Sequence, residues 1–362
     1  MRIGIDAHHL NGKPQGSRTY LIELIRALVP LVHAHDELEV YSFQPSATEQ
    51  LLDVRGPRHH RVFPKTARVR LPLVVPALEL VHGLDLFHSQ YIAPPVSFVP
   101  EVVTIHDVLF ETHRELFEGA FSERSVRLIR RSAERASAVL TVSEFSRQAI
   151  LEAYELPEER VWVTPNAVDH DRFHPFEPPS DLRAHYGLEG PFVLSVGRLE
   201  PRKNLERLVR AFSVRPRDVT LAIVGMSDFR FDRILDAMKD LPDGTVKLLG
   251  AVPDAHLPAL YNLAEAFAYP SLAEGFGLPV LESMACGTPL LTSDRGALSE
   301  VAGDAALYID PEDVDSIADG LSRILTDSLL REKLTAAGLA RAKSFTWSET
   351  ARKTLAAYRS VL

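Results

Sequence analysis

Residues 271–294 of the 362-residue chain read SLAEGFGLPVLESMACGTPLLTSD and place two glutamates around a glycine-rich turn. Glu274 comes before Gly-Phe-Gly-Leu-Pro, and Glu282 comes after it. The preceding run AFAYPS, residues 266–271, is rich in strand-forming residues, so it predicts a strand that delivers Glu274 at its carboxyl end. Pro279 suits the first turn of a helix, and we expect that helix to carry Glu282 one turn later.

The turn between the two glutamates has the composition of a backbone anion site. Gly275 and Gly277 let the main chain approach a ligand closely and offer unhindered N–H donors. The helix that follows adds unpaired N–H groups and the positive end of its dipole. We therefore expect a diphosphate at this turn, with one carboxylate on each side accepting hydrogen bonds from paired hydroxyls such as those of a sugar or a ribose. The alternative is that Glu282 is an ordinary first-turn acid and Glu274 a loop charge.

A second loop supplies positive charge. The segment VGRLEPRKNLERLVRAF, residues 196–212, follows the predicted strand PFVLSVG and precedes a helix that we expect to begin near Asn204. Arg198 and Lys203 lie in this loop, at the carboxyl end of the strand, where ligands of open α/β sheets bind. An arginine fork and a lysine ammonium group can hold a diphosphate without a metal ion.

Strand-like runs alternate with amphipathic helical patterns along the whole chain. This alternation predicts an α/β fold with parallel sheets covered by helices on both faces. The length favours two domains, and the three prolines of HPFEPPSD, residues 174–181, interrupt helix and strand near the middle. The strands are expected at residues 2–7, 38–43, 84–89, 102–107, 138–143 and 160–166 in the first half, and at residues 191–197, 219–225, 246–252, 266–271, 289–294 and 305–310 in the second.

The last helix is expected to return to the first domain. Residues 347–362 follow the second domain, with Thr346 as a possible N-cap. Leu355, Tyr358 and Leu362 form one apolar stripe that needs a partner surface. We therefore predict two doubly wound, Rossmann-like domains: residues 1–173 together with helix 347–362, and residues 174–346.

Bulk composition narrows the classes of function. The net charge of −9 disfavours a nucleic-acid binder, and the single cysteine, Cys286, fits a reducing cytoplasm. We see no signal peptide and no apolar run long enough to span a membrane.

Residues 55–70, RGPRHHRVFPKTARVR, carry six Lys/Arg and no carboxylate. This basic segment is either a solvated loop or a patch for anionic lipid or a pyrophosphate-bearing acceptor, in which case the protein would act at the inner face of the membrane.

The two loops, EGFGLPVLESMACGTP and GRLEPRKN, resemble those of the retaining glycosyltransferases of family 4, which have the GT-B fold. The first half also carries marks of that family, TIHD, TVSEFS and PNAVD, so the resemblance covers essentially the whole chain. It implies two Rossmann-like domains facing a central cleft, a GDP- or UDP-sugar donor as substrate, and neither a cofactor nor a metal ion. GRLEPRKN is common among mannosyltransferases of bacterial surface polysaccharides, which makes GDP-mannose the first expectation for the donor.

The resemblance also implies a role for individual residues. Glu274 would bind hydroxyls of the donor sugar, and Glu282 would bind the nucleotide ribose. Arg198 and Lys203 would hold the diphosphate, and His106 would reach the transferred sugar from the first domain, although a lone histidine there is as often structural. The other donor contacts would come from the backbone around Gly250 and Val252, from the loop Gly12–Gly16, and from Gly275, Phe276, Gly277 and Leu278.

The implied reaction is transfer of a hexose, first of all mannose, to a glycan or lipid-linked acceptor with retention of configuration. Two alternatives remain open at this point: a GT-B phosphorylase or nucleotide-sugar epimerase, and a non-catalytic nucleotide-sugar-binding protein. A dinucleotide-binding protein is disfavoured because G-x-G-x-x-G follows the first strand of neither half. Asp313 and Asp315 match a D-x-D metal pattern, but they follow Pro311 at the start of a helix, where acids complement the dipole.

Overall fold

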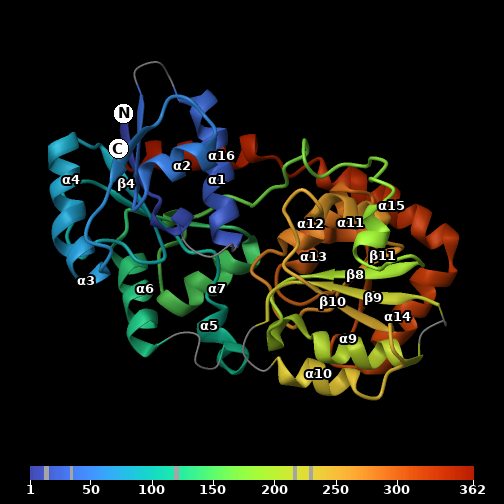
Figure 1. Cartoon of the computed structure of the whole chain (residues 1–362). Coiled ribbons are helices and arrows are strands. Elements are labelled where there is room, and N and C mark those ends of the chain that lie inside the picture. The colour runs from blue at the N-terminus through green and yellow to red at the C-terminus, as the bar shows by residue number, and fades with distance from the viewer. Residues whose placement is uncertain (12–15, 33–35, 118–121, 215–217, 228–230) are drawn as a thin grey trace. The chain divides into compact units, whose positions relative to one another are not determined.

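The computed structural model describes residues 1–11, 16–32, 36–117, 122–214, 218–227 and 231–362, and the chain divides into two compact units (Figure 1). Unit 1 comprises Met1–Asn166 and Thr346–Leu362, and unit 2 comprises Ala167–Phe345. Each unit is built on its own parallel sheet, with helices packed against it. The α/β fold of two Rossmann-like domains predicted from the sequence is confirmed.

In the described residues, unit 1 holds a seven-stranded sheet of order β3-β2-β1-β4-β5-β6-β7, all parallel. Its core strands are fully buried because helices cover both faces, as in other all-parallel sheets. The strands are β1 (Arg2–Asp6), β2 (Glu37–Ser42), β3 (Arg58–Arg61), β4 (Leu86–Gln90), β5 (Glu101–Thr104), β6 (Ala138–Thr141) and β7 (Val161–Val163).

The helices of unit 1 are α1 (Gly16–Leu28), α2 (Pro45–Leu52), α3 (Ala67–Val69), α4 (Val75–His82), α5 (Leu109–Thr112), α6 (Glu123–Arg135), α7 (Glu144–Tyr154) and α16 (Trp347–Ser360). A π-helical turn, Arg70–Val74, joins α3 to α4. Serine or threonine side chains cap α6, α7 and α16, because their oxygens accept from the free N–H groups of the first turn.

In unit 2 the described residues form a six-stranded parallel sheet of order β10-β9-β8-β11-β12-β13. The strands are β8 (Phe192–Val196), β9 (Thr220–Val224), β10 (Val246–Gly250), β11 (Ala266–Tyr269), β12 (Leu290–Ser293) and β13 (Ala306–Ile309). The helices are α8 (Leu182–His185), α9 (Leu205–Ala211), α10 (Asp232–Met238), α11 (Leu257–Leu263), α12 (Leu278–Ala285), α13 (Leu298–Ala302), α14 (Val314–Thr326) and α15 (Ser328–Ala342). One apolar cluster runs from α9 through β9 and β11 to α14 and closes one face of this sheet.

Each of the twelve strand ranges expected from the sequence overlaps a strand, but β3 was not foreseen. Its four residues, Arg-His-His-Arg, belong to the basic segment 55–70 and show no apolar alternation. They form a strand because they occupy the edge of the sheet, where β2 supplies the pairing and the side chains remain partly exposed. Tertiary context therefore outweighs the local pattern here.

The unit boundary lies at Asn166/Ala167, before the expected 173/174 division. The intervening residues pack on unit 2: Phe173 is buried against the Tyr261 ring, with 6.1 Å between centroids. The proline-rich segment 174–181 also belongs to unit 2, because Phe176 N–H donates to the Asn262 side chain at 3.1 Å.

α16 completes unit 1 by packing against α1. Thr346 caps it, Leu355 and Tyr358 are buried, and the Tyr358 hydroxyl lies 2.6 Å from His88 Nδ1 in β4. Leu362 was also expected to pack there, but it is 59% exposed because the helix ends at Ser360.

Candidate active site in unit 2

The candidate residues of unit 2 gather where the strand order of its sheet reverses. β8 lies between β9 and β11, and ligands of such sheets bind at the carboxyl ends of the strands beside the reversal. The loop after β8 carries Arg198, Arg202 and Lys203, and the loop after β11 carries Glu274. The main chain joins the two loops, since Leu272 N–H donates to the Arg202 carbonyl at 2.9 Å.

Glu274 is buried, and two cations hold its carboxylate. Lys203 Nζ donates to one carboxylate oxygen at 2.6 Å, and Arg202 Nη1 donates to the other at 2.5 Å. Burial would raise the pKa of Glu274, but Arg202 and Lys203 outweigh that effect and hold it at about 2. Glu274 is therefore ionised at neutral pH. Each of its oxygens has two lone pairs, so it keeps acceptor capacity for the hydroxyls of a ligand.

Lys203 is also buried and belongs to the same cluster. Its ammonium group donates to the Tyr269 hydroxyl at 2.5 Å, and it lies 4.8 Å from the centroid of that ring. Burial lowers the pKa of Lys203, Arg202 lowers it further, and the Glu274 and Glu200 carboxylates oppose both effects. Tyr269 and Glu274 take two of its three N–H donors, which leaves the third for another partner.

Arg202 is a member of the cluster that sequence reasoning missed. Its Nη2 donates to Glu200 at 2.7 Å, and its Nη1 donates to the Ala273 carbonyl at 3.0 Å as well as to Glu274. Arg202 thus connects the loop after β8 to the carboxylate delivered by β11, and it fixes the orientation of that carboxylate. The available signal was the run Glu-Pro-Arg-Lys, in which Arg202 adjoins Lys203 and has the carboxylate of Glu200 two residues before it.

Arg198 differs from Lys203, although the sequence treated the two cations alike. Arg198 is exposed at the carboxyl end of β8, where a ligand can reach it, whereas Lys203 is buried. The neighbouring backbone is tightly packed: a Cβ on Gly225 would lie 1.8 Å from the Gly197 carbonyl oxygen. This close approach of the β8 and β9 ends requires glycine.

Two glycines, Gly277 and Gly296, allow the close packing around Glu274 and the turn that follows it. Gly277 has φ +99°, and a Cβ there would meet Leu298 Cδ2 at 2.7 Å. Gly296 has φ +66° and lies so close to Glu274 that a Cβ would be 2.3 Å from the Glu274 carbonyl oxygen. α12 begins one residue earlier than expected and has Pro279 in its first turn. The residue that sequence reasoning missed here is Gly296, which supports Glu274 from the loop after β12.

The four residues of the predicted backbone site differ in exposure. Gly275, Phe276 and Gly277 are buried, and Leu278 is partly exposed. The Phe276 ring packs in the interior, 5.9 Å from the centroid of Phe345, so only the backbone of Phe276 is suited to a ligand contact.

Glu282, on α12, has a different environment from Glu274. Its carboxylate accepts a hydrogen bond from the Tyr261 hydroxyl at 3.0 Å. Burial raises the pKa of Glu282 to about 7, although the Tyr261 hydrogen bond and the Arg172 charge act in the opposite direction. Since no cation in the described part of the chain pairs with it directly, Glu282 changes its charge near neutrality.

The loop after β10 supplies the segment expected to face the base. Gly250 has φ +66° and open space where a Cβ would be, and its carbonyl accepts from Gly225 N–H at 2.9 Å. Val252 is partly exposed. The structure thus leaves room beside Gly250 at the carboxyl end of β10.

His106 belongs to unit 1 and follows β5. It is buried, its Nε2 lies 3.1 Å from the Gln90 side-chain oxygen, and the Tyr20 ring meets it edge-on at 4.8 Å. Burial lowers the pKa of His106 to about 3, so the imidazole is neutral at physiological pH.

Gly16 is the first residue of α1 and is exposed; the rest of the expected loop, residues 12–15, lies outside the described residues.

The D-x-D pair is a helix cap. Asp313 Oδ1 accepts from the Asp315 N–H at 3.0 Å at the start of α14. No group of three or more His, Cys, Asp or Glu side chains in the described part of the chain is arranged to hold a metal ion.

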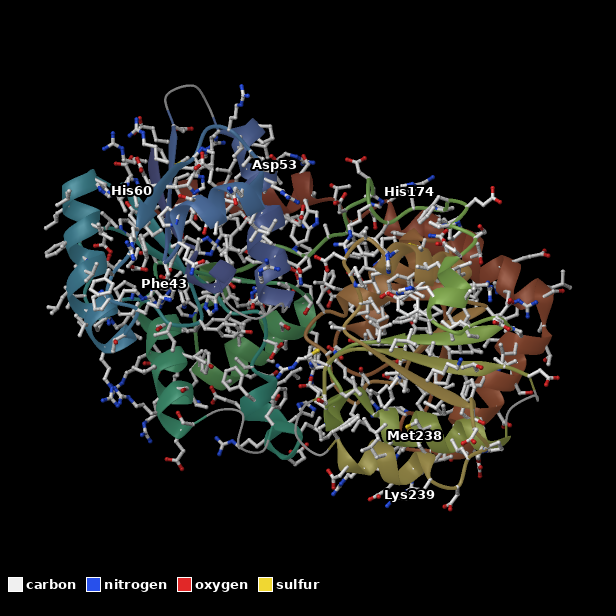
Figure 2. The ribbon with its side chains drawn as sticks, in the orientation of Figure 1. Phe43, Asp53, His60, His174, Met238 and Lys239 are labelled. Atoms are coloured by element: carbon white, nitrogen blue, oxygen red, sulfur yellow. The ribbon has the colours of Figure 1, made fainter. Side chains whose placement is uncertain are left out.

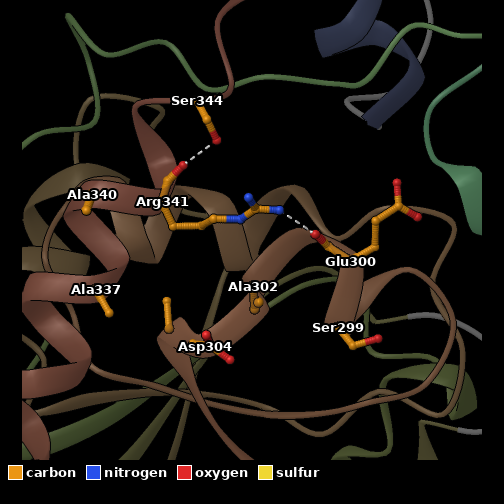
Figure 3. Close-up of a pocket in the computed structure, with 10 residues that line it drawn as sticks. Ser299, Glu300, Ala302, Asp304, Ala337, Ala340, Arg341 and Ser344 are labelled. Atoms are coloured by element: carbon orange, nitrogen blue, oxygen red, sulfur yellow. Dashed lines mark hydrogen bonds between the residues drawn. The ribbon is translucent and has the colours of Figure 1, made fainter.

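A shallow pocket of about 520 Å³ lies elsewhere in unit 2, between α13 and α15 (Figure 3). Arg341 lines it, but its guanidinium donates to the carbonyls of Glu300 and Val301 at 2.7 and 3.0 Å, which caps the end of α13. None of the residues around the Glu274 cluster lines this pocket, so we assign it no part in the chemistry.

Two family models match the chain. Residues 14–172 match the model described as Glycosyltransferase Family 4, and residues 182–341 match the model described as Glycosyl transferases group 1. The O-antigen chain mannosyltransferase B of Escherichia coli is 32% identical, over 95% of this chain and 96% of that protein. The chain belongs to the GT-B glycosyltransferases of family 4. The family and the enzyme class predicted from the sequence are therefore confirmed.

Other relatives of this glycosyltransferase agree with the assignment. The serotype-specific mannosyltransferase WbdA of Escherichia coli is 30% identical over 79% of this chain, and the match spans 37% of that longer protein. Among solved structures, Anabaena Alr3699/HepE in complex with UDP and glucose matches with a TM-score of 0.79, covering 99% of this chain and 100% of that one, at 24% identity. This likeness concerns the fold alone.

Proposed function

We propose that this glycosyltransferase transfers mannose from GDP-mannose to a glycan or lipid-linked acceptor, with retention of the anomeric configuration. The choice of sugar is supported by the names of two relatives, the O-antigen chain mannosyltransferase B and the mannosyltransferase WbdA. A UDP-hexose is the second candidate donor, because Anabaena Alr3699/HepE, which shares the fold, is described with UDP and glucose.

The observation that carries the proposal is the Glu274 cluster at the strand-order reversal of unit 2. Its anion and its cations lie on neighbouring loops: the ionised Glu274 accepts hydrogen bonds, while Lys203 and the exposed Arg198 offer positive charge. A nucleotide sugar presents these complementary groups in the same order, since sugar hydroxyls are attached to a diphosphate. We assign Glu274 to the hydroxyls of the transferred sugar and the two cations to the diphosphate.

The cations also account for rate acceleration. When the bond between the sugar carbon and the diphosphate breaks, negative charge grows on the departing oxygen. Lys203, which Glu274 and Tyr269 hold, and the N-terminus of α12 are already in place in the folded protein, and together with the exposed Arg198 they stabilise that charge. These protein cations make a metal ion unnecessary, so we propose a metal-independent reaction.

Since neither carboxylate is assigned as a nucleophile, we propose that retention comes from substitution on a single face of the sugar. Glu274 is engaged by Arg202 and Lys203, which lowers its reactivity as a nucleophile, and Glu282 is assigned to the ribose. We propose that the acceptor hydroxyl attacks from the face that the diphosphate leaves and transfers its proton to the leaving phosphate oxygen. His106 is the residue of unit 1 that we assign to the transferred sugar, as a neutral hydrogen-bonding group.

The test uses purified protein with GDP-mannose, UDP-glucose, GDP and UDP in thermal-shift measurements. The true donor at 100 times its Kd should stabilise the fold by ~2.7 kcal/mol, and the others should stabilise it less. Lys203→Ala should lose the shift, whereas Arg210→Ala, which removes an exposed cation of α9 paired with Glu206, should keep it. Equal shifts in wild type and Lys203→Ala would remove Lys203 from donor binding.

The reaction class is tested separately with donor and a mannan acceptor. Release of free nucleoside diphosphate only with acceptor present, and an α-linked product from an α-linked donor by proton NMR, are expected. Nucleotide release or a changed sugar without acceptor would favour the phosphorylase or epimerase alternative. Binding without any turnover would favour the non-catalytic one.

A further inference from the structure

Gln90 is the last residue of β4, and His106 follows the neighbouring strand β5, so both lie at the carboxyl edge of the unit 1 sheet. Phe43, labelled in Figure 2, follows β2 at the same edge. β1 lies between β2 and β4, so the strand order of this sheet reverses beside β4. Ligands of open α/β sheets bind at the carboxyl edge beside such a reversal. Gln90 therefore lies where unit 1 is expected to meet a ligand, although no sequence motif singled it out.

Contacts from three elements hold the His106 imidazole in place. Its Nε2 lies 3.1 Å from Oε1 of Gln90 in β4, and the Tyr20 ring of α1 meets it edge-on with 4.8 Å between centroids. The Thr141 hydroxyl, at the end of β6, donates to the His106 carbonyl at 3.3 Å. The Tyr20 hydroxyl lies 3.1 Å from Oγ1 of Thr104. All of these partners are buried, and they hold the ring with Nε2 directed at Gln90.

The contact with Gln90 decides which ring nitrogen of His106 carries the proton. Burial lowers the pKa of His106 to about 3, so the ring is neutral and has one N–H and one acceptor nitrogen. An amide oxygen can only accept a hydrogen bond, so the nitrogen beside it, Nε2, holds the proton. Nδ1 is then an acceptor, and no protein partner for it is found in the described part of the chain.

Gln90 does not add to the stability of unit 1 by its amide nitrogen. The residue is 3% exposed, and its Nε2 has no hydrogen-bond partner among the described residues. A buried donor without a partner is destabilising, whereas methionine, an unbranched side chain of similar length, has no donor to satisfy. Packing alone therefore does not account for a glutamine at this position, and its contact with His106 does.

The next residue, Tyr91, is a second local cost at the same place. It has φ +58°, in the left-handed region that bulky side chains rarely adopt, and its ring centroid lies 5.6 Å from that of His106. Backbone conformations of this kind are retained chiefly at functional sites. The strained turn and the unpaired amide thus point to the same edge of the sheet.

We propose that Gln90 is a positioning residue of this glycosyltransferase: it accepts from Nε2–H of His106, and so keeps Nδ1 as an acceptor for a hydroxyl of the transferred sugar. This inference rests on the proposed function, in which His106 binds that sugar. Its consequence is a requirement on the substrate, because a ring nitrogen without a proton binds a group that donates a hydrogen bond and not one that only accepts. The sugar must present a hydroxyl hydrogen to His106.

The first measurement is the tautomer itself, by heteronuclear NMR of the full chain with isotope-labelled histidine and without donor. His106→Gln identifies the His106 signals by their loss. Wild type should show the Nε2–H tautomer, and Gln90→Met should show a larger share of the Nδ1–H tautomer. An Nδ1–H tautomer in wild type, or an unchanged tautomer in Gln90→Met, would overturn the proposal. Because no donor is present, this result stands even if the proposed donor and reaction are wrong.

The second measurement is turnover. Gln90→Met should lower kcat between about twofold and tenfold, the range of one net hydrogen bond. Its urea midpoint should equal or exceed that of wild type, followed by tryptophan fluorescence, since Trp162 and Trp347 both belong to unit 1. Gln148→Met is the matched control, because Gln148 is exposed on α7 of the same unit and donates to Glu152 at 2.7 Å. It should change neither the tautomer nor kcat. A wild-type kcat in Gln90→Met would overturn the proposal.

Donor analogues test the requirement for a hydroxyl hydrogen. The hydroxyl that His106 binds is the one whose removal weakens donor binding in wild type but not in His106→Ala. At that position the deoxyfluoro donor should bind as weakly as the deoxy donor, because fluorine has no hydrogen to donate. Restored binding of the deoxyfluoro donor would show that His106 donates from Nδ1, which contradicts the assigned tautomer.

Discussion

Replacing Glu282 by glutamine should stabilise the free enzyme at pH 8 and leave its stability at pH 5 nearly unchanged. The folded structure raises the pKa of this carboxyl from 4.5 to about 7, with burial as the main cause. Glutamine keeps an oxygen that can accept the Tyr261 hydrogen bond, and it has no charge to desolvate. The substitution therefore removes the cost of ionisation and little else.

The sign and size of this change in unfolding free energy follow from proton linkage. Because the folded pKa is above the unfolded one, the folded state binds more protons between pH 4.5 and 7, and stability falls as the pH rises through that window. The two pKa values differ by about 2.5, which corresponds to about 3 kcal/mol at pH 8. Glu282 is partly exposed, so solvent screening reduces this, and we expect a gain of about 1–3 kcal/mol in the unfolding free energy.

The measurement is urea unfolding at pH 5 and pH 8, followed by circular dichroism, because unit 2 contains no tryptophan. Glu332→Gln is the control, since Glu332 is an exposed residue of α15 in the same unit. Its unfolding free energy should match wild type at both pH values. If Glu282→Gln is no more stable than wild type at pH 8, the carboxyl is not desolvated in the folded protein and the assignment of its pKa is wrong.

The remaining predictions concern the active site. Lys203→Ala or Arg198→Ala should lower kcat on the order of 10²-fold or more, the usual cost of losing an oriented charge partner, and wild-type rates at saturating acceptor would contradict this. Arg202→Met should lower kcat as well, because Glu274 loses one of its two cations, and Arg202→Lys should restore part of the rate; equal rates in the two variants would argue against a positioning role. Turnover should survive EDTA, and restoration by added Mg²⁺ or Mn²⁺ would show that a metal is required. Donor KM should rise as the pH falls below about 7 in wild type, because protonated Glu282 loses acceptor capacity, and the pH dependence should vanish in Glu282→Gln.

The strands and the two loops that carry charged site residues, after β8 and β11, could be predicted from the sequence because they depend on local composition. Buried parallel strands are continuous apolar runs, and glycine and proline mark the turn after Glu274. The ion-pair partners of the site residues could not be predicted in the same way. Arg202 joins Lys203 at Glu274 because the β8 and β11 loops meet at the strand-order reversal. Arg202 and Glu274 are 72 residues apart in the sequence.

The strand β3 was missed for a related reason. The basic segment was predicted as a solvated loop or an anionic patch, and its pattern carries no strand signal. Sheet-edge pairing with β2 makes it a strand. This pairing is a long-range contact, and no local pattern specifies it.

The return of α16 to unit 1 reverses the order in which the two units can be finished during synthesis. Unit 2 is one continuous segment, so all of its residues are available before residue 346 has been made. Unit 1 is discontinuous, and its interior lacks Tyr358, the partner of His88, until 270 further residues have followed that histidine. The N-terminal unit therefore keeps part of its core open until every residue of unit 2 has been synthesised.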